Sequence, residues 1–381
     1  VQDADLARYE LAYAPLEGGE WVTFFTGIGQ VTNAALGTFD PTLLRNGYAR
    51  LRLRAVDVQG LTAEDEVLIS VQGYLKLGHF TLSATELEVP APGIAVRVLR
   101  EYDSRDKALR DFGVGWRLRL VTVDLNEGPD HSVILENPIA ERVEYRLHLE
   151  PDTPIAPRFF TVSYRPSDRM DRSSLDFETP EDVDLGNHIL AKDGVGNLFW
   201  FPEAIPFDPT IYRLTLLDGT VLRVDDTEGL LQAIKPDGNT LTITRDGIFH
   251  SSGQSARFER DGLDRITKIT DPRGSEQTYE YSPAGDLARH VDPEGFATTF
   301  TYREDHHLLE WFDARGLRFQ KNEYDDAGRL SAVVDALGRR TEFASDLDGR
   351  REVVTDRAGN LVITEYDASG RATAIVTDGT R

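Results

Sequence analysis

The chain has 381 residues, of which 40% are hydrophobic and none is cysteine. This length and apolar content suit two or three domains with hydrophobic cores and exclude a disordered chain. The absence of cysteine excludes a disulfide framework and cysteine chemistry. The 65 Asp and Glu residues against 42 Lys and Arg residues give a formal net charge of −23, which excludes nucleic acid and anionic membrane surfaces as partners.

Residues 1–73 are expected to form a first module. The segment NGYARLRLRAVDVQGLTAEDEVLISVQG contains two stretches of alternating apolar and polar residues around an Asp-containing turn, which is typical of paired strands. The pattern resembles the last strands of immunoglobulin-like or fibronectin-like modules, so we expect a small β-sandwich with Trp21, Phe24 and Phe25 in its core. The number of strand-like segments, about five, leaves open whether the sandwich is complete.

Residues 74–211 are expected to form a second β region with irregular loops. Within it, residues 150–210 are rich in proline and acidic residues and have poor periodicity. Such a segment predicts long loops.

Residues 212–381 carry a repeat. The phrase Asp-x-x-Gly recurs at steps of 21 or 22 residues, beginning at Asp271, Asp292, Asp313, Asp335 and Asp356. A second turn ends in Gly within most units, as in SPAG at 282–285 and DDAG at 325–328, and the residues between the turns alternate as in strands. One unit is therefore predicted to be a β-hairpin, and the hairpins to pair into one antiparallel ribbon that begins near Tyr212.

These repeats resemble a known family. The stretches YSPAGDLARHVDPEG, YDDAGRLSAVVDALG and YDASGRATAIVTD are similar to the YD repeats of the RHS (rearrangement hot spot) family, and FTLSATELEVPAPGIAVRVLREYDSRDKALRDFGVGWRL resembles the segment that opens RHS shells. The resemblance covers residues 80–381, although 125–210 are only loosely similar. It implies an all-β hairpin ribbon that spirals into a hollow shell, as in bacterial polymorphic toxins, the BC component of Tc toxins and the teneurin ectodomain. Here we expect an open or incomplete shell.

One family feature has no counterpart here. RHS toxins end in an acidic core segment that cleaves itself and releases a variable C-terminal toxin, and nothing after Asp356 resembles that segment. No residue of this chain is therefore assigned to autoproteolysis.

Two polar features invite a metal site. The Asp-x-x-Gly phrases could bind calcium, but each supplies only one or two carboxylates, so turn formation is the favoured explanation. His306 and His307, with Glu304 and Asp305 beside them, could bind metal or transfer protons. Because His306 occupies the position of the turn glycine in other units, we interpret the pair as a varied loop tip. We predict neither a metal nor a cofactor.

A series of aromatic residues recurs at strand spacing in the repeats. It could form a sugar-stacking platform, but a cross-strand ladder that holds the sheet together is the favoured interpretation. The series consists of Tyr279, Tyr281, Phe300, Tyr302, Tyr324, Phe343 and Tyr366.

We expect no enzyme, because the Gly pairs in GIGQ, GVGW and GVGN lack the context of a phosphate site and no nucleophile has a base beside it. No catalytic residue is predicted. The main hypothesis is a structural shell segment that encapsulates a cargo or toxin polypeptide of a secreted bacterial polymorphic toxin. Its partners would be that polypeptide and the remaining shell of the same chain or of a partner chain. If the acidic wall holds the polypeptide by charge, the polypeptide would be basic.

The alternative is an adhesion module at the bacterial cell surface that binds a glycan or a surface protein. Neither hypothesis involves nucleic acid. No run of 18 apolar residues occurs, so we expect no membrane insertion by this segment.

Overall fold

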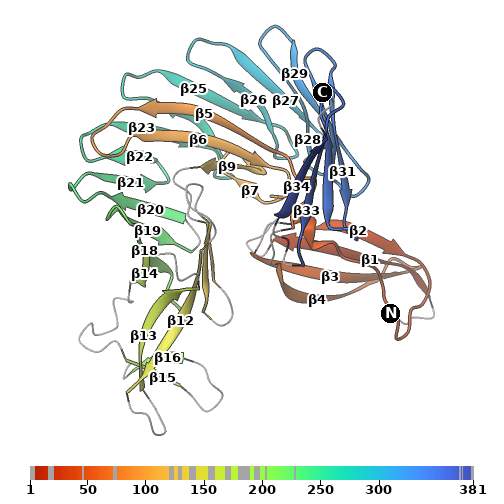
Figure 1. Ribbon diagram of the computed structural model, residues 1–381, viewed down its shortest axis with the longest axis horizontal. Coiled ribbons are helices and arrows are strands. Elements are labelled where there is room, and N and C mark those ends of the chain that lie inside the picture. The colour runs from red at the N-terminus through yellow and green to blue at the C-terminus, as the bar shows by residue number, and fades with distance from the viewer. Residues whose placement is uncertain are drawn as a thin grey trace.

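The computed structural model contains five β-sheets and, among the residues it describes, a single short 3-10 helix (Figure 1). The all-β prediction is confirmed. No helix in this part of the chain is long and apolar enough to cross a membrane. The described residues are 5–15, 21–44, 47–71, 75–119, 124–127, 131–136, 143–152, 159–167, 173–178, 189–192, 198–201, 204–226, 229–368, 370 and 372–378.

The N-terminal sheet has four antiparallel strands in the order β2-β1-β3-β4. These are β1 (Leu6–Pro15), β2 (Val22–Gly27), β3 (Gly47–Asp57) and β4 (Thr62–Val71). Alternation along the strands gives the sheet one apolar face, and this face has a core of its own around Tyr13, Ala49 and Val71.

The expected sandwich is wrong for the described part of residues 1–73, which forms one sheet. The segment after β2, including the 3-10 helix η1 (Pro41–Leu43), covers the apolar face in place of a second sheet. Phe24 packs there against Phe39, with ring centroids 5.3 Å apart. Phe25 is 38% exposed, and Trp21 lies under the Arg52 guanidinium at 4.3 Å, so neither joins this core.

Three further sheets occupy the second region. Residues 75–119, here named the strap, form a three-stranded sheet and a small hairpin. The strap sheet consists of β5 (Thr81–Val89), β6 (Val96–Asp103) and β9 (Trp116–Arg119), and the hairpin of β7 (Leu109–Arg110) and β8 (Gly113–Val114). The next sheet has seven strands: β10 (Asp124–Glu127), β11 (Val133–Glu136), β12 (Val143–Pro151), β13 (Phe159–Pro166), β15 (Ile189–Lys192), β16 (Leu198–Phe201) and β17 (Ile205–Pro206).

The prediction of long irregular loops over 150–210 is therefore wrong for the residues described there. Four of the seven strands lie mainly in this range, and they bury Leu190, Trp200 and Phe207 in a small core. The strands are short and interrupted, so their alternation is too brief to stand out from the proline-rich sequence around them.

The repeats form a continuous antiparallel sheet of 18 strands. It begins with β14 (Ser174–Phe177), continues with β18, and then adds each strand beside its predecessor in sequence. The strands are β18 (Ile211–Thr215), β19 (Val221–Asp225), β20 (Gly229–Ile234), β21 (Thr240–Thr244), β22 (Gly247–His250), β23 (Ser255–Arg260), β24 (Ile266–Thr270), β25 (Glu276–Tyr281), β26 (Leu287–Val291), β27 (Ala297–Tyr302), β28 (Leu308–Phe312), β29 (Arg318–Tyr324), β30 (Leu330–Asp335), β31 (Arg340–Asp346), β32 (Arg351–Thr355), β33 (Leu361–Tyr366) and β34 (Ala372–Asp378).

This ribbon curves in one direction, as Figure 1 shows from β18 to β34. A β-bulge recurs at the same place in several hairpins, where the register shifts at Tyr281, Tyr302, Tyr324 and Tyr366. A bulge bends its strand and increases the local twist, so repetition at a fixed position bends the sheet progressively. The periodic sequence thus produces a curved wall.

The Asp-x-x-Gly turns have the geometry that their residue types predict. In the turn at 313–317, the Asp313 carboxylate accepts hydrogen bonds from the N–H groups of Arg315 and Leu317, each at 2.9 Å. Gly316 closes the turn with a φ of 76°, which residues with a Cβ avoid. The turn signals of the sequence therefore act locally.

Replacing Gly316 by Ala is expected to cost about 1–2 kcal/mol in the free energy of unfolding, through left-handed backbone strain alone. A Cβ at this position would meet no atom within 4 Å, so no clash contributes. Urea denaturation followed by circular dichroism measures the change. Gly262→Ala is the matched control, because Gly262 also has open space but no positive φ, and an equal cost at both sites would contradict the account.

Among the described residues, one edge of β34 has no neighbouring strand. Within the described residues β34 pairs only with β33, and its Ile375 and Val376 are 68% and 52% exposed. Unpaired strand edges with apolar side chains promote association. We expect light scattering of residues 1–381 to show concentration-dependent association that Ile375→Lys suppresses. Leu263→Lys, at an exposed turn far from this edge, should leave it unchanged, and a dilution-insensitive monomer would contradict the prediction.

Candidate functional site

The strap covers one face of the ribbon and lies inside its curve in Figure 1. Aromatic residues of the strap pack against the aromatic series of the repeats, and the two sets share one hydrophobic core. Phe112 meets Tyr279 edge to face at 4.9 Å, and Trp116 meets Phe300 at 5.5 Å. The Trp116 indole N–H also donates to the Tyr302 hydroxyl at 2.8 Å.

The aromatic series is therefore neither an exposed platform for sugar stacking nor a ladder whose members contact only one another across strands. Its buried members contact strap side chains, so they lie beneath a cover that occupies the place where a sugar would stack. Tyr324 instead packs on His307 at 4.6 Å. Phe343 and Tyr366 lie beyond the hydrophobic core that the strap shares with the repeats.

A buried ion pair reinforces this cover. Arg100 donates to Glu86 at 2.8 Å, and their side chains are 3% and 1% exposed. The Tyr279 hydroxyl donates to the same carboxylate at 2.7 Å, and the Arg100 guanidinium lies 4.4 Å from the Trp116 ring. The two opposite charges of the strap sheet thus compensate each other inside the core, and the Tyr279 hydroxyl ties them to a repeat strand.

The strap also runs along one edge of the ribbon and hydrogen-bonds to successive turns. The backbone N–H of Ile266 donates to Asp111, and that of Val114 donates to Gly285, at 2.7 and 3.2 Å. The Tyr102 hydroxyl donates to the carbonyl of His306 at 2.8 Å. These contacts follow one another from turn to turn, so the strap closes the edge at which most repeat units place their second turn.

At the next turn, a further backbone bond links the strap to the ribbon. The N–H of Leu330 donates to the carbonyl of Gly78 at 2.6 Å. Beside it, Asp40, the N-cap residue of η1, forms an ion pair with Arg329. The N-terminal sheet is therefore attached to the ribbon near this turn.

The two histidines singled out in the sequence have separate surroundings. His306 has a φ of 64°, in the position where other turns have glycine, and its ring contacts Asp286 at 2.8 Å. His307 is buried, not at a loop tip as expected, and its ring contacts Asp305 at 2.8 Å. Burial lowers the pKa of His307.

The carboxylates of the repeated turns cap the backbone N–H groups of their own loops, as at Asp271 and Asp356. No group of three or more potential metal ligands occurs among the residues that the structure describes.

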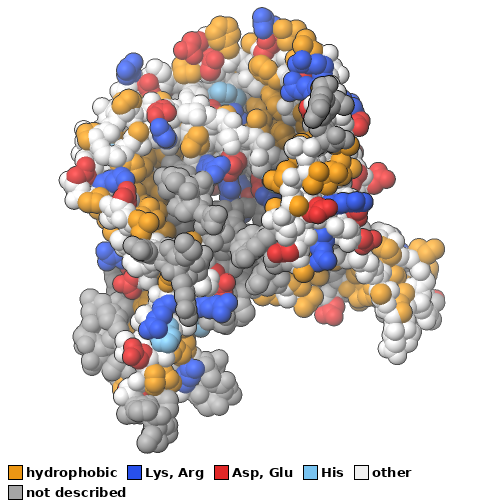
Figure 2. All heavy atoms as spheres, viewed as in Figure 1, with side chains coloured by type: hydrophobic (Ala, Val, Ile, Leu, Met, Phe, Trp, Pro, Cys, Tyr) orange, Lys and Arg blue, Asp and Glu red, His pale blue; other side chains and the backbone are white. Residues whose placement is uncertain are grey.

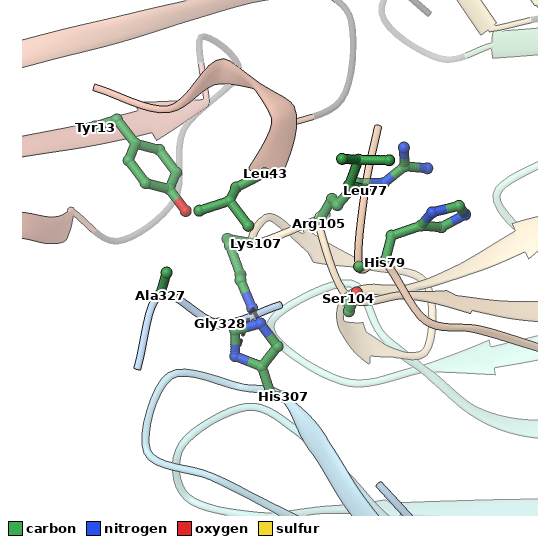
Figure 3. A pocket seen from close by; sticks show the side chains of 11 residues that line it. Tyr13, Leu43, Leu77, His79, Ser104, Arg105, Lys107, His307, Ala327 and Gly328 are labelled. Carbon is green, nitrogen blue, oxygen red and sulfur yellow. Dashed lines mark hydrogen bonds between the residues drawn. The ribbon is translucent and has the colours of Figure 1, made fainter. Parts of the chain in front are cut away.

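A small pocket lies where the N-terminal sheet, the strap and the repeats meet (Figure 3). The cavity volume of this junction pocket is about 20 Å³, which is room for about one water molecule. Tyr13 approaches from the N-terminal sheet and Leu43 from η1, while the Lys107 side chain extends from the strap toward His307 of the repeats. The complete lining is Tyr13, Leu43, Leu77, Gly78, His79, Ser104, Arg105, Lys107, His307, Ala327 and Gly328.

The electrostatics of this pocket follow from burial. Burial lowers the pKa of Lys107 to about 8 and raises the pKa of Tyr13 to about 12. Burial alone would raise the pKa of Asp305, but hydrogen bonds from Arg303 and His307 hold it below its usual range. The pocket therefore joins a weakly basic amine to a neutral imidazole.

Sequence reasoning missed Glu86, Arg100 and Lys107. Each contacts residues about 200 positions away, for example Tyr279 for Glu86 and Asp305 for Lys107. The alternation of β5 and β6 places Glu86 and Arg100 on strands, and Lys107 lies between β6 and β7, but nothing local marks these residues as buried.

The stability of the fold is expected to fall as pH drops below about 6.5, the ordinary pKa of histidine. Burial lowers the pKa of His79, His290 and His307, so folding favours their neutral forms and is penalised once the unfolded chain binds protons. Each contributes a slope of at most about 1.4 kcal/mol per pH unit. Melting temperatures between pH 8 and 5.5 test this. His307→Gln should flatten the slope, and a pH-independent melting temperature would contradict it.

Comparison with known proteins agrees with this architecture. Residues 324–361 match the RHS Repeat family model. The chain is 32% identical over 126 residues to the double-stranded DNA deaminase toxin A of Burkholderia cenocepacia, and 32% identical over 141 residues to the toxin protein Tse5 of Pseudomonas aeruginosa. These matches span 33% and 35% of this chain but 9% and 10% of those proteins.

Among solved structures, TcdB2-TccC3-TEV matches at 10% identity and a TM-score of 0.31 over 87% of this chain and 22% of that one. The Tc holotoxin pore of Photorhabdus luminescens matches at 12% identity and a TM-score of 0.23, over 94% of this chain and 23% of that one.

The fold thus defines an all-β hairpin-repeat protein. Residues 324–361 of the ribbon match an RHS repeat, which confirms in that segment the resemblance to the RHS family predicted from the sequence.

Proposed function

We propose that this chain is a structural, non-enzymatic segment of an RHS shell that encloses a cargo or toxin polypeptide of a secreted bacterial toxin. The observation that carries the proposal is the 18-stranded ribbon, which curves in one direction and has its second-turn edge closed by the strap. A curved sheet whose core and one edge are covered is suited to form part of a wall between two volumes. The partial similarity to two bacterial toxins supports this use of the wall.

The wall performs its function through geometry. Each hairpin adds to the preceding one, each bulge adds curvature, and the strap pins consecutive turns to one another. The cargo polypeptide would be held by the enclosed volume. Figure 2 shows acidic and basic side chains interspersed on the visible face, so charge there is spread out and not gathered in one patch.

The test is to image the protein as its gene encodes it by electron cryo-microscopy. The proposal predicts that further strands pair with β34, that the curve closes, and that polypeptide density fills the interior. An extended ribbon with an empty concave side, together with binding to glycans or to a surface protein, would contradict it and favour the adhesion hypothesis.

A further inference from the structure

A row of apolar side chains lies on the edge of the ribbon opposite the second-turn edge. This edge, here named the first-turn edge, carries the Asp-x-x-Gly turns. Three consecutive turns place a large apolar residue on it: Phe296, Leu317 and Leu337 are 64%, 57% and 77% exposed. Exposed apolar side chains are ordinary when they are scattered, but a row of them marks an interaction surface.

The turns hold the first two side chains of this row in the same position. Phe296 and Leu317 each follow the turn glycine, and the N–H of each donates to the aspartate four residues earlier, at 2.8 and 2.9 Å. Because neighbouring strands lie about 4.8 Å apart and each unit adds two strands, equivalent side chains recur about every 10 Å along the edge. A partner surface with the same period would meet each of them in turn.

The second-turn edge has the opposite character at the same turn position. There the residue after the turn glycine is Asp286 or Arg329. Asp286 is buried beside His306, and Arg329 forms an ion pair with Asp40. Polar residues thus occupy the edge that is covered, and apolar residues occupy an edge that the described residues leave exposed. This distribution is the reverse of the one that water favours, which indicates that the first-turn edge is covered in the assembled protein.

The aspartates beside the row are already compensated within the chain. Arg315 donates to Asp313 at 2.7 Å, and Arg339 donates to Asp335 at 2.8 Å. Arg357 of the next turn also pairs with Asp335, at 3.1 Å. The feature left for a partner to recognise is therefore the apolar row, and apolar contacts with few charges are typical of the centre of an interface.

We propose that the first-turn edge is the interface with a later coil of the same ribbon, in which Phe296, Leu317 and Leu337 are the apolar contacts. This inference rests on the proposed function, because it requires the ribbon to continue past β34. Curvature in one direction brings a continuing ribbon back beside its first coil, where the strap already occupies the second-turn edge. The later coil therefore lies on the first-turn edge, and its hairpin turns repeat with the same spacing of about 10 Å.

The experiment is hydroxyl-radical footprinting of the protein as its gene encodes it, with mass spectrometry to quantify oxidation of each leucine. Leu317 and Leu263 form a matched pair, because both lie in turns of the ribbon and are 57% and 61% exposed, but Leu263 lies on the second-turn edge. We expect Leu317 and Leu337 to be oxidised at least about fivefold more slowly than Leu263, since the later coil excludes water from them. Oxidation of Leu317 at the rate of Leu263 would overturn the proposal.

A cross-linking arm identifies what covers the row. A benzophenone amino acid incorporated in place of Leu317 is expected to cross-link, within one chain, to residues that follow Arg381. A cross-link between two copies, or slow oxidation of Leu317 that is lost on dilution, would show association of copies and overturn the proposal.

Trypsin resistance of the enclosed polypeptide, measured on the same sample, reports on the proposed function separately. Resistance together with fast oxidation of Leu317 would leave the wall in place and reject its interface with a later coil. Loss of resistance as well would reject both.

Discussion

Glu86→Gln is expected to lower the free energy of unfolding by about 3–5 kcal/mol, because it leaves the Arg100 guanidinium charged and unpaired inside the core. Both side chains are almost completely buried, at 1% and 3% exposure, so water cannot compensate the lost carboxylate. The same change removes the charged acceptor of the Tyr279 hydroxyl, which joins the strap to the ribbon. Urea denaturation followed by circular dichroism measures the effect.

The matched control is a second Arg–Glu pair on the same two strands. Arg97 and Glu88 lie 2.7 Å apart but are 58% and 48% exposed, so Glu88→Gln should cost less than about 1 kcal/mol. Equal effects at Glu86 and Glu88 would show that burial does not govern the pair. Replacing Glu86 and Arg100 together by leucine and methionine should recover much of the loss, since no unpaired charge then remains.

Trp116→Ala is expected to cost about 3–5 kcal/mol, the range for truncating a buried aromatic side chain. Trp116 is completely buried between the strap and the repeats, where it contacts Phe300 and donates to the Tyr302 hydroxyl. The substitution leaves a cavity at the interface and a hydroxyl without its donor. Thermal and urea denaturation should both report the loss.

Two comparisons separate this interface effect from a general sensitivity. Leu337→Ala removes an apolar side chain that is 77% exposed and should change stability by less than about 0.5 kcal/mol. In a double-mutant cycle, Trp116→Ala and Phe300→Ala should show a coupling of about 0.5–1.5 kcal/mol. Strict additivity would contradict direct packing of the strap on the repeats.

The parts of the fold that the sequence predicts are those with local signals. Asp313 and Gly316 specify their turn through their own side chain and backbone preference, and the unit repeats, so the ribbon follows from one hairpin. The strap cannot be derived in this way. Its position depends on pairings such as Trp116 with Tyr302, which are 186 residues apart and leave no periodic trace.

The N-terminal sheet illustrates the same limit. Its alternating strands predict a sheet with one apolar face, but alternation does not say what covers that face. Phe39 and Leu43 of the segment after β2 cover this face, where a second sheet was expected. The junction pocket is equally hidden, because Lys107 has no distinguishing sequence context.

The most direct test of the wall is protease protection in the protein as its gene encodes it. The account predicts that polypeptide enclosed by the ribbon resists trypsin while the shell is folded, and is cut at the rate of its denatured form once urea unfolds the shell. It further predicts that Glu86→Gln lowers the urea concentration at which protection is lost, whereas Glu88→Gln does not. Cleavage of that polypeptide in the native shell at the denatured rate would contradict the account.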